Sequence, residues 1–476
     1  MSKNIYIYYE YYKREFLSNL LLGVIASKKK FNIYIGSNDV FNILHKKKLI
    51  SPGIFHTKSL SHGPKKTNFH KDLRKKKFLI TVQDQEHGVI NKSTYFDNFH
   101  TTTRIQEEDL KSCSAYFCWG NFDFKHLKNR FKKKVFYLTG SPRVDLWKKK
   151  FDNLWIRSKI KNKYFLFVSN YSLANNHYSF EKIIRRKKFE NYYIRSPNLK
   201  KMDLAIYEYQ TKSMKKFINL IINFSKKFPN ESIIVRPHPT EKKELWEEKL
   251  RNCKNISIKP DGDLSSYIKN AKCVVQDGCT SAMESFIRNI PVINFVPLNT
   301  NKHAHGYFVK KMSINIRNEK NFFKIIRSKK YKVLKNKKRL VNDRMIYLGK
   351  KLSATKITDI WSNLFKRNNY LKNNNKKFIN NNSSIYFYLL IFQNLRSFLT
   401  TIILFLKRKS FLKSQIYHKN QKLDLDDINR KITIIYHTPE MIDWVYQNLK
   451  NKKRLSIKLI EVDRKSLDEN SMSSPN

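Results

Sequence analysis

The chain has 476 residues, of which 41% are hydrophobic, and its formal net charge is +58. This length and apolar content predict two or three folded domains and exclude a chain that is disordered throughout. Lys, Asn, Ile, Phe and Tyr are frequent while Gly and Pro are scarce, which is the bias of an AT-rich genome, so the charge is weak evidence for any partner. No RNA-binding aromatic motif, zinc-finger spacing or basic zipper is present, and we expect no specific nucleic-acid partner.

The five cysteines are scattered along the sequence, with no CxxC pair and no histidine at metal-ligand spacing. This pattern predicts neither a disulfide framework nor a metal site, and it fits a reducing compartment. The first nine residues have the composition of a strand and lack the apolar core of a signal peptide. We therefore expect a cytoplasmic protein.

The first part of the chain alternates short apolar strands with helical stretches. A helix is expected over 14–29, and strands are expected over 3–10, 31–37, 78–83, 115–119 and 135–138. This rhythm predicts a parallel sheet covered by helices, which we assign to a first Rossmann-like lobe over residues 1–150.

The same rhythm restarts after a lysine-rich stretch and predicts a second Rossmann-like lobe over 160–365. Its expected strands are 164–169, 232–235, 256–258, 273–276 and 292–295, and its expected helices are 202–227, 241–251, 264–270 and 281–289. The fold class is therefore α/β with two lobes, and a ligand cleft is expected at the carboxyl ends of the strands.

An Asn/Lys-rich linker over 366–384 leads to a C-terminal extension of mixed structure over 385–476, with candidate strands at 432–436 and 455–462 and a disordered end from 466. The apolar helix expected over 385–406 is long enough to span a membrane, but Gln393, Asn394 and Arg396 fall at its centre. A central Arg costs roughly 2.5–3.5 kcal/mol on insertion. We expect this helix to lie on the inner membrane surface or to pack on the second lobe.

The sharpest motif is Arg236-Pro237-His238-Pro239, at the end of the apolar strand 232–235. Prolines fix the backbone and end strand pairing, so His238 is held at the carboxyl end of the strand. Arg236 and His238 both suit a phosphate group. A proline turn with a half-buried histidine accounts for the same residues equally well.

A second motif, Gly278-Cys279-Thr280-Ser281, lies between a strand and a helix, with Glu284 on the helix. A glycine turn followed by hydroxyl residues and free backbone amides suits a phosphate. We also expect Ser281 and Glu284 to form a capping box, which is compatible with phosphate binding.

Two further turns follow strands of the first lobe. Gly140-Ser141-Pro142-Arg143 is placed at the edge of the cleft, although a simple turn explains it as well. Glu86 lies in a polar turn over 84–88 and could serve as a general base. The sequence has no Walker loop and no GxGxxG, so a dinucleotide or an NTP-hydrolysing site lacks support, and the 261–263 DxD reads better as the start of a helix.

In this order, the segments resemble the bacterial surface carbohydrate biosynthesis protein family, which is related to GT-B glycosyltransferases and to non-hydrolysing UDP-N-acetylglucosamine 2-epimerases. The matching segments are 86–88, 119–120, 140–145, 236–239 with Trp246, 278–281 with Glu284, and 291–293. The sequence departs from the family pattern at His87, which replaces a second acid, and at Ser141 and Ser281, which replace Asn and Thr.

The resemblance implies a GT-B fold, with the lobe 1–150 on the acceptor side and the lobe 160–365 on the nucleotide-sugar side. It also implies a nucleotide-sugar donor, a glycan or glycolipid acceptor, and a role in building surface polysaccharide such as capsule or LPS. By that likeness His238, Thr280 and Ser281 contact the donor phosphate and Glu86 is the catalytic base. The implied enzyme is a metal-independent inverting glycosyltransferase with no cofactor. Two alternatives stay open: a nucleotide-sugar 2-epimerase or hydrolase with the same fold, and a basic nucleic-acid-binding protein.

Overall fold

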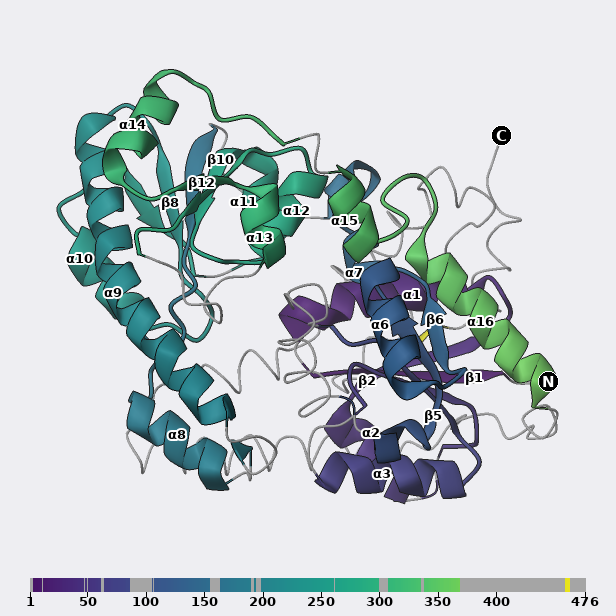
Figure 1. Cartoon of the computed structure of the whole chain (residues 1–476). Coiled ribbons are helices and arrows are strands. Elements are labelled where there is room, and N and C mark those ends of the chain that lie inside the picture. Colours follow the sequence, from purple (N-terminus) through teal and green to yellow (C-terminus); the bar gives the residue numbers. More distant parts are fainter. Residues whose placement is uncertain are drawn as a thin grey trace, which may run out of the picture. The chain divides into compact units, whose positions relative to one another are not determined.

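A computed structural model describes residues 3–368 and 459–462, apart from residues 11, 47, 49, 61–63, 86–104, 106, 155–162, 190–191, 194–197, 261, 299–306 and 335–337. The described residues form two compact units. The first contains the described residues up to Gln85, Glu107–Leu146 and those from Ile346 onward, and the second contains Trp147–Met345. The predicted two-lobe α/β architecture is confirmed (Figure 1).

The first unit is built on a seven-stranded sheet with the order β13-β2-β1-β3-β4-β5-β6. Its neighbouring strands are parallel, except that β13 pairs antiparallel with β2. The strands are β1 (Asn4–Tyr9), β2 (Asn32–Ser37), β3 (Ile54–Thr57), β4 (Leu79–Val82), β5 (Cys113–Cys118), β6 (Phe136–Leu138) and β13 (Leu459–Val462).

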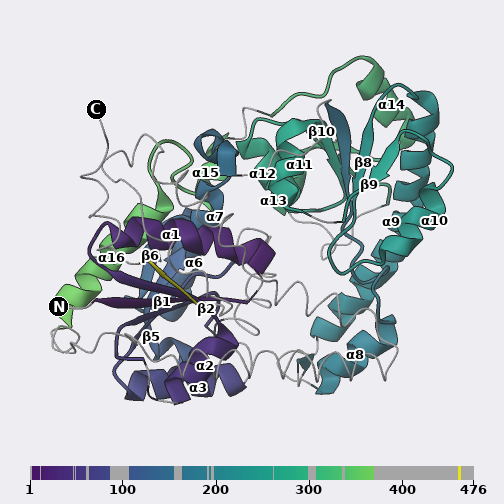
Figure 2. The same ribbon diagram turned by 180° about the vertical axis from the view of Figure 1, so that it is seen from behind.

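Helices cover this sheet on both faces. They are η1 (Tyr12–Phe16), α1 (Leu17–Ser27), α2 (Asn38–Lys46), α3 (Pro64–Lys75), α5 (Glu107–Leu110), α6 (Asn121–Phe131), α7 (Pro142–Asp145) and α16 (Ser353–Arg367). Figure 2 shows α2 and α3 on one face of the sheet and α1 and α16 on the other. The strands pack apolar side chains against both layers, as expected for a parallel sheet.

Helix α16 follows the second unit in sequence but packs in the first, next to α1 and α7. Its indole Trp361 is fully buried, donates to the hydroxyl of Thr81 at 3.2 Å and lies beside the ring of His56. Phe365 packs on Phe31, with ring centroids 5.5 Å apart. The expectation that residues up to 365 belong to the second lobe therefore differs from the structure, because the chain returns to the first unit at Ile346.

The second unit has a six-stranded parallel sheet with the order β12-β11-β10-β7-β8-β9. The strands are β7 (Tyr164–Val168), β8 (Ile233–Arg236), β9 (Ile256–Ile258), β10 (Ala271–Gln276), β11 (Val292–Phe295) and β12 (Ile314–Ile316). From the centre of the sheet, β7, β8 and β9 follow one another towards one edge, and β10, β11 and β12 follow one another towards the other edge. This order is that of the Rossmann fold, with the reversal between β7 and β10.

The helices of the second unit connect these strands and cover both faces. They are η4 (Lys149–Leu154), α8 (Phe180–Phe189), α9 (Asn198–Lys227), α10 (Lys243–Leu250), α11 (Leu264–Asn270), α12 (Ser281–Ile287), α13 (Tyr307–Met312), α14 (Glu319–Arg327) and α15 (Lys338–Arg344). Most predicted elements of this lobe are confirmed, whereas α8, β12, α13 and α14 were not predicted.

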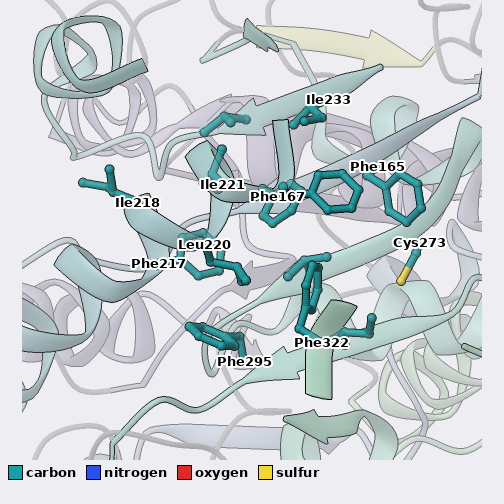
Figure 3. Close-up of a cluster of buried hydrophobic side chains, with 14 of the residues drawn as sticks. Phe165, Phe167, Phe217, Ile218, Leu220, Ile221, Ile233, Cys273, Phe295 and Phe322 are labelled. Atoms are coloured by element: carbon teal, nitrogen blue, oxygen red, sulfur yellow. The ribbon is translucent and has the colours of Figure 1, made fainter. Parts of the chain in front are cut away.

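Alternate residues of β7 point to opposite faces of the second sheet, as the period of a strand requires. Phe165 and Phe167 belong to an aromatic core that includes Phe217 of α9 (Figure 3). Phe224, two turns further along α9, packs on Phe165. The intervening side chains of β7 belong to a smaller core with Ile268 of α11. Burial on both faces fixes β7 in the centre of the sheet, so the loop that follows it starts from a rigid position.

Candidate functional site

Three loops leave the second sheet at the carboxyl ends of adjacent strands. They follow β8, β7 and β10, and they begin at Pro237, Ser169 and Asp277. The strand order reverses between β7 and β10, and open α/β sheets bind their ligands outside the carboxyl ends of the strands at such a reversal. The two sharpest sequence motifs therefore both lie at the edge of the sheet where a ligand is expected.

His238 is held in the loop after β8 by its own backbone and by its neighbour Thr240. The His238 backbone N–H donates to the hydroxyl of Ser169 at 3.1 Å. Its ring Nδ1 accepts the Thr240 backbone N–H at 3.3 Å and lies 2.8 Å from the Thr240 hydroxyl. An Nδ1 that accepts a hydrogen bond carries no proton, so the neutral ring has its N–H at Nε2. The loop thus presents a histidine in a defined tautomer.

Glu241 ties this loop to the loop after β7. Its buried carboxylate accepts the hydroxyl of Ser169 at 2.8 and 2.9 Å, the backbone N–H of Tyr171 at 2.7 Å and the indole N–H of Trp246 at 2.8 Å. Burial raises the pKa of Glu241, and these donors only partly offset that effect. Sequence reasoning missed this residue. The Trp five positions further on was the available signal.

Arg236 has a different set of contacts from those predicted. Its Nη1 donates to the carbonyl of Lys259 at 2.7 Å, its Nη2 donates to the carbonyl of Gly262, and its guanidinium lies over the ring of Tyr267. The side chain therefore holds the loop between β9 and α11. These two hydrogen bonds use only two of the five guanidinium N–H donors, so they position the side chain without excluding a phosphate contact.

Asp277 begins the turn after β10 and its carboxylate is buried. It accepts three hydroxyl groups, from Tyr171 at 3.0 Å, from Tyr209 at 3.2 Å and from Ser213. Burial and the charge of Asp277 raise the pKa of both tyrosines. Asp277 thus joins the turn after β10 to the loop after β7 and to α9, a role that the sequence motif did not reveal.

The amides of Gly278 and Cys279 are already used within the fold. Gly278 N–H donates to Oδ1 of Asn294 at 3.1 Å, and Cys279 N–H donates to Oε1 of Gln276. Gly278 has a φ of +69°, which lets the chain turn there without strain. The expectation that these two amides bind phosphate therefore conflicts with their hydrogen bonds, because side chains at the strand ends accept both of them. Gln276 and Asn294 also bond each other across β10 and β11.

The capping box predicted for Ser281 and Glu284 is wrong. Helix α12 begins at Ser281, Thr280 is its N-cap, and Thr280 makes no capping hydrogen bond through its side chain. Glu284 instead accepts a hydrogen bond from Arg288 Nε at 3.1 Å, one turn along the helix. The Ser281 hydroxyl is buried and has no nitrogen or oxygen partner among the described residues.

The cleft-edge motif Gly140-Ser141-Pro142-Arg143 lies in the first unit and anchors α16. Gly140 has a φ of +74°, and a Cβ there would lie 2.3 Å from the hydroxyl oxygen of Ser353. Asp145 accepts the Ser353 hydroxyl at 3.2 Å, and Arg143 donates to the carbonyl of Gln85 at 3.1 Å. The positions of Gly140 and Arg143 are thus explained by packing within this unit, whereas the buried Ser141 hydroxyl has no hydrogen-bond partner among the described residues.

Some predictions lie outside the described residues, namely Glu86, the 385–406 helix and the strand 432–436. The strand expected over 455–462 is present in part as β13. Among the described residues, no group of three His, Cys, Asp or Glu side chains could hold a metal ion. In the same part of the chain, no helix is both long and apolar enough to cross a membrane.

No family model and no curated protein matches the chain. Similar solved structures include the UDP-GlcNAc 2-epimerase of Methanocaldococcus jannaschii in complex with UDP-GlcNAc and UDP, at 15% identity and a TM-score of 0.45, over 76% of this chain and 100% of that one. The UDP-GlcNAc 2-epimerase of Neisseria meningitidis bound to UDP-GlcNAc matches at 10% identity and a TM-score of 0.44, over 77% and 100%.

The wall teichoic acid polymerase TagF matches at 10% identity and a TM-score of 0.42, over 77% of this chain and 90% of that one. The structural neighbours of this chain therefore include nucleotide-sugar epimerases and a polymerase of a cell-wall polymer.

Proposed function

We propose that the protein is a glycosyltransferase that takes a sugar from a nucleotide-sugar donor and passes it to a glycan or glycolipid acceptor in surface polysaccharide synthesis. The observation that carries the proposal is the meeting of three loops at the strand-order reversal of the second sheet. Two buried carboxylates join these loops through hydrogen bonds. Glu241 connects the loops after β7 and β8, and Asp277 connects the loops after β7 and β10.

The chemistry at this edge suits a leaving group that gains negative charge. As the bond between sugar and phosphate breaks, charge develops on phosphate oxygens, and donors that are already oriented stabilise it without reorganisation. His238 supplies an N–H at Nε2, because Thr240 occupies Nδ1. The hydroxyls of Thr280 and Ser281 supply further donors at the end of β10, and we retain them in the proposed phosphate site.

In the proposed reaction the acceptor hydroxyl loses its proton to Glu86 and its oxygen forms a bond to the anomeric carbon. The bond from that carbon to the phosphate oxygen breaks at the same time, and its electron pair leaves with the nucleotide. This is a single displacement, so the configuration of the anomeric carbon inverts. The scheme requires no metal ion, since the donors named above hold the departing charge.

The test is a thermal-shift panel of UDP, CMP and GDP sugars on the full chain, followed by product analysis with the donor that binds. A bound ligand raises the melting temperature by mass action. We expect one base to respond, His238→Ala to weaken turnover by about 100-fold or more, and His126→Ala, a histidine of α6, to behave like the wild type. Full turnover by His238→Ala would overturn the phosphate assignment.

Product analysis without any acceptor separates the transferase from its rival. Release of an epimerised sugar or of free sugar under those conditions would favour the 2-epimerase or hydrolase. Sugar transfer that strictly requires an acceptor would support the transferase.

A further inference from the structure

Helix α8 of the second unit lies beside the first turns of α9, and one of its faces is used in that contact (Figures 1 and 2). Phe180 stacks on Tyr207 of α9, with ring centroids 4.0 Å apart. The half-buried isoleucines at 183 and 184 and the side chain of Lys187 follow on the same face, at the spacing that a helix requires. The Lys187 ammonium donates to the buried Asp203 carboxylate at 2.7 Å. This face of α8 therefore belongs to the fold.

The opposite face of α8 is exposed and basic. Lys182, Arg185 and Arg186 recur at the spacing of one helix face, and all three are exposed. Five of the ten residues of α8 are Lys or Arg, and one, Glu181, is an acid. In the described part of the chain, no carboxylate forms an ion pair with Lys182 or Arg185. The positive charge of this face is therefore directed at the solvent.

Phe189 completes this face, because it lies four residues after Arg185 at the end of the helix. Its side chain is 89% exposed. Transfer of an exposed aromatic ring from water to an apolar phase is favourable. A basic face that also presents a bare ring favours a partner that offers both negative charge and an apolar phase.

The first turns of α9 show the same combination. Leu204 is 40% exposed, and it is the only large apolar side chain besides Phe189 that is exposed among the described residues. Lys200 and Lys201, four and three residues before it, are exposed as well. The exposed apolar side chains of the described residues thus both lie on this pair of helices, each next to exposed cations.

Helix α14 shows that a basic composition alone does not produce such a surface. It also exposes basic residues, including Lys324 and Arg327. Its aromatic residues Phe322 and Phe323 are buried in the core of the second unit. Charges outside and rings inside are the ordinary pattern of a surface helix. In α8, by contrast, one ring is inside and another, Phe189, is outside among the cations.

We propose that the exposed face of α8 binds an anionic lipid surface, with its Lys and Arg side chains at the phosphate headgroups and the Phe189 ring between the lipid chains. Clusters of about four to eight Lys and Arg recognise anionic lipids, and an inserted apolar side chain adds a second, independent attraction. Single-stranded nucleic acids are held by several aromatic platforms, whereas this face presents one ring. The proposal does not depend on the reaction at the second sheet.

The first experiment measures sedimentation of the full wild-type chain with lipid vesicles. Vesicles of phosphatidylcholine are compared with vesicles in which part of it is replaced by phosphatidylglycerol. We expect the anionic vesicles to bind at least about tenfold more tightly, because each basic residue near an anionic surface adds about fivefold. An increase in NaCl from about 0.1 M to about 1 M should remove most of this difference, since it shortens the screening length from about 10 Å to about 3 Å.

The second experiment separates α8 from the general positive charge of the chain. The double variant Lys182→Glu/Arg185→Glu changes the net charge as much as Lys324→Glu/Arg327→Glu on α14, which is the matched control. The α8 variant should bind anionic vesicles at least about 25-fold more weakly than the wild type, and the α14 variant should stay within about fivefold of it.

The third experiment tests the ring of Phe189 without a change of charge. Phe189→Ser should weaken binding to anionic vesicles by about tenfold. Phe189→Trp should keep binding, and brominated lipid chains should quench its fluorescence more than that of the wild type. These side chains are exposed, so the variants should keep the fold, and circular dichroism checks this.

Any of three results would overturn the proposal. The first is a wild type that binds neither kind of vesicle, including one that binds single-stranded DNA instead, which would assign the face to a nucleic acid. The second is equal binding of anionic vesicles by the α8 and α14 variants, and the third is unchanged binding by Phe189→Ser. Nucleotide-sugar binding is read separately on the same proteins, so failure of the proposed donor site gives a different result.

Discussion

The indole N–H of Trp246 donates to the carboxylate of Glu241 at 2.8 Å, which connects α10 to the loop that carries His238. The same carboxylate accepts the hydroxyl of Ser169, and that hydroxyl oxygen accepts the backbone N–H of His238. One buried acid thus fixes the strand-end loops of β7 and β8. Replacing it should affect both the stability of the second unit and the position of His238.

Glu241→Gln should lower the free energy of unfolding by about 1–3 kcal/mol. The substitution replaces one acceptor oxygen by an NH₂ group, which then faces donors from Ser169, Tyr171 or Trp246. Urea unfolding monitored by circular dichroism measures the change. Glu248→Gln, at an exposed position of α10, is the control and should stay within about 0.5 kcal/mol of the wild type. Equal effects of the two substitutions would contradict the role of Glu241.

The stability difference between wild type and Glu241→Gln should also depend on pH. Because burial raises the pKa of Glu241 in the folded state, the folded protein holds this proton more tightly than the unfolded chain does. The resulting stability is fully present below the unfolded pKa and is lost as pH rises through the folded value. The advantage of wild type over the variant should therefore shrink as pH increases from about 4 upward, and a growing advantage would show the opposite shift.

Gly140→Ala should destabilise the first unit by about 1–3 kcal/mol. The alanine would have a φ of +74° and a Cβ 2.3 Å from the Ser353 hydroxyl oxygen, so it would force α16 away from its site. Gly349→Ala is the matched control, because a Cβ there meets nothing within 4 Å. The melting temperatures of the two variants check the prediction, and a neutral Gly140→Ala would mean that the turn tolerates a side chain.

Asp277→Asn and Ser213→Ala should not be additive. Ser213→Ala removes a hydroxyl that donates to the Asp277 carboxylate, and Asp277→Asn removes the charge and one of the two acceptor oxygens of that group, while Tyr171 and Tyr209 still face position 277. A double-mutant cycle by urea unfolding should give a coupling energy of about 0.5–3 kcal/mol. Additive effects of the two substitutions would mean that the hydroxyl network around Asp277 is not formed in solution.

Several parts of the fold could be predicted from local sequence. The alternation of apolar strands and helices predicted both lobes, and the prolines around His238 and the glycine at 278 predicted where strands end. These signals are local, because a strand period or a turn residue shows within a few positions. Strand β3 was missed, because only two of its four residues, Ile54 and Phe55, are apolar.

The rest depended on contacts between residues far apart in sequence. Asp277 directly precedes the motif 278–281, but its partners Tyr171, Tyr209 and Ser213 lie on a loop and a helix 64 to 106 positions away. The Arg236 guanidinium is occupied by carbonyls more than 20 positions further on. The predicted capping box failed because the helix begins at Ser281, one residue earlier than a Ser281 cap requires, so Ser281 lies inside the helix and Thr280 is its N-cap. A motif shows which side chains are present at a site. The packing around it determines which of their hydrogen-bonding groups are already used within the fold.

The return of the chain to the first unit at Ile346 makes that unit a host and the second unit a guest inserted into it. The first unit is complete only when Leu146 and Ile346, which flank the second unit in sequence, are both in place. Closing a flexible loop costs free energy that rises only slowly with its length, by about 0.6 kcal/mol for each doubling. An unfolded second unit would therefore destabilise the first unit only modestly, whereas removal of α16 would take away the helix that carries the buried Trp361. A fragment that ends at residue 345 would contain the whole second unit but would lack the last helix of the first unit.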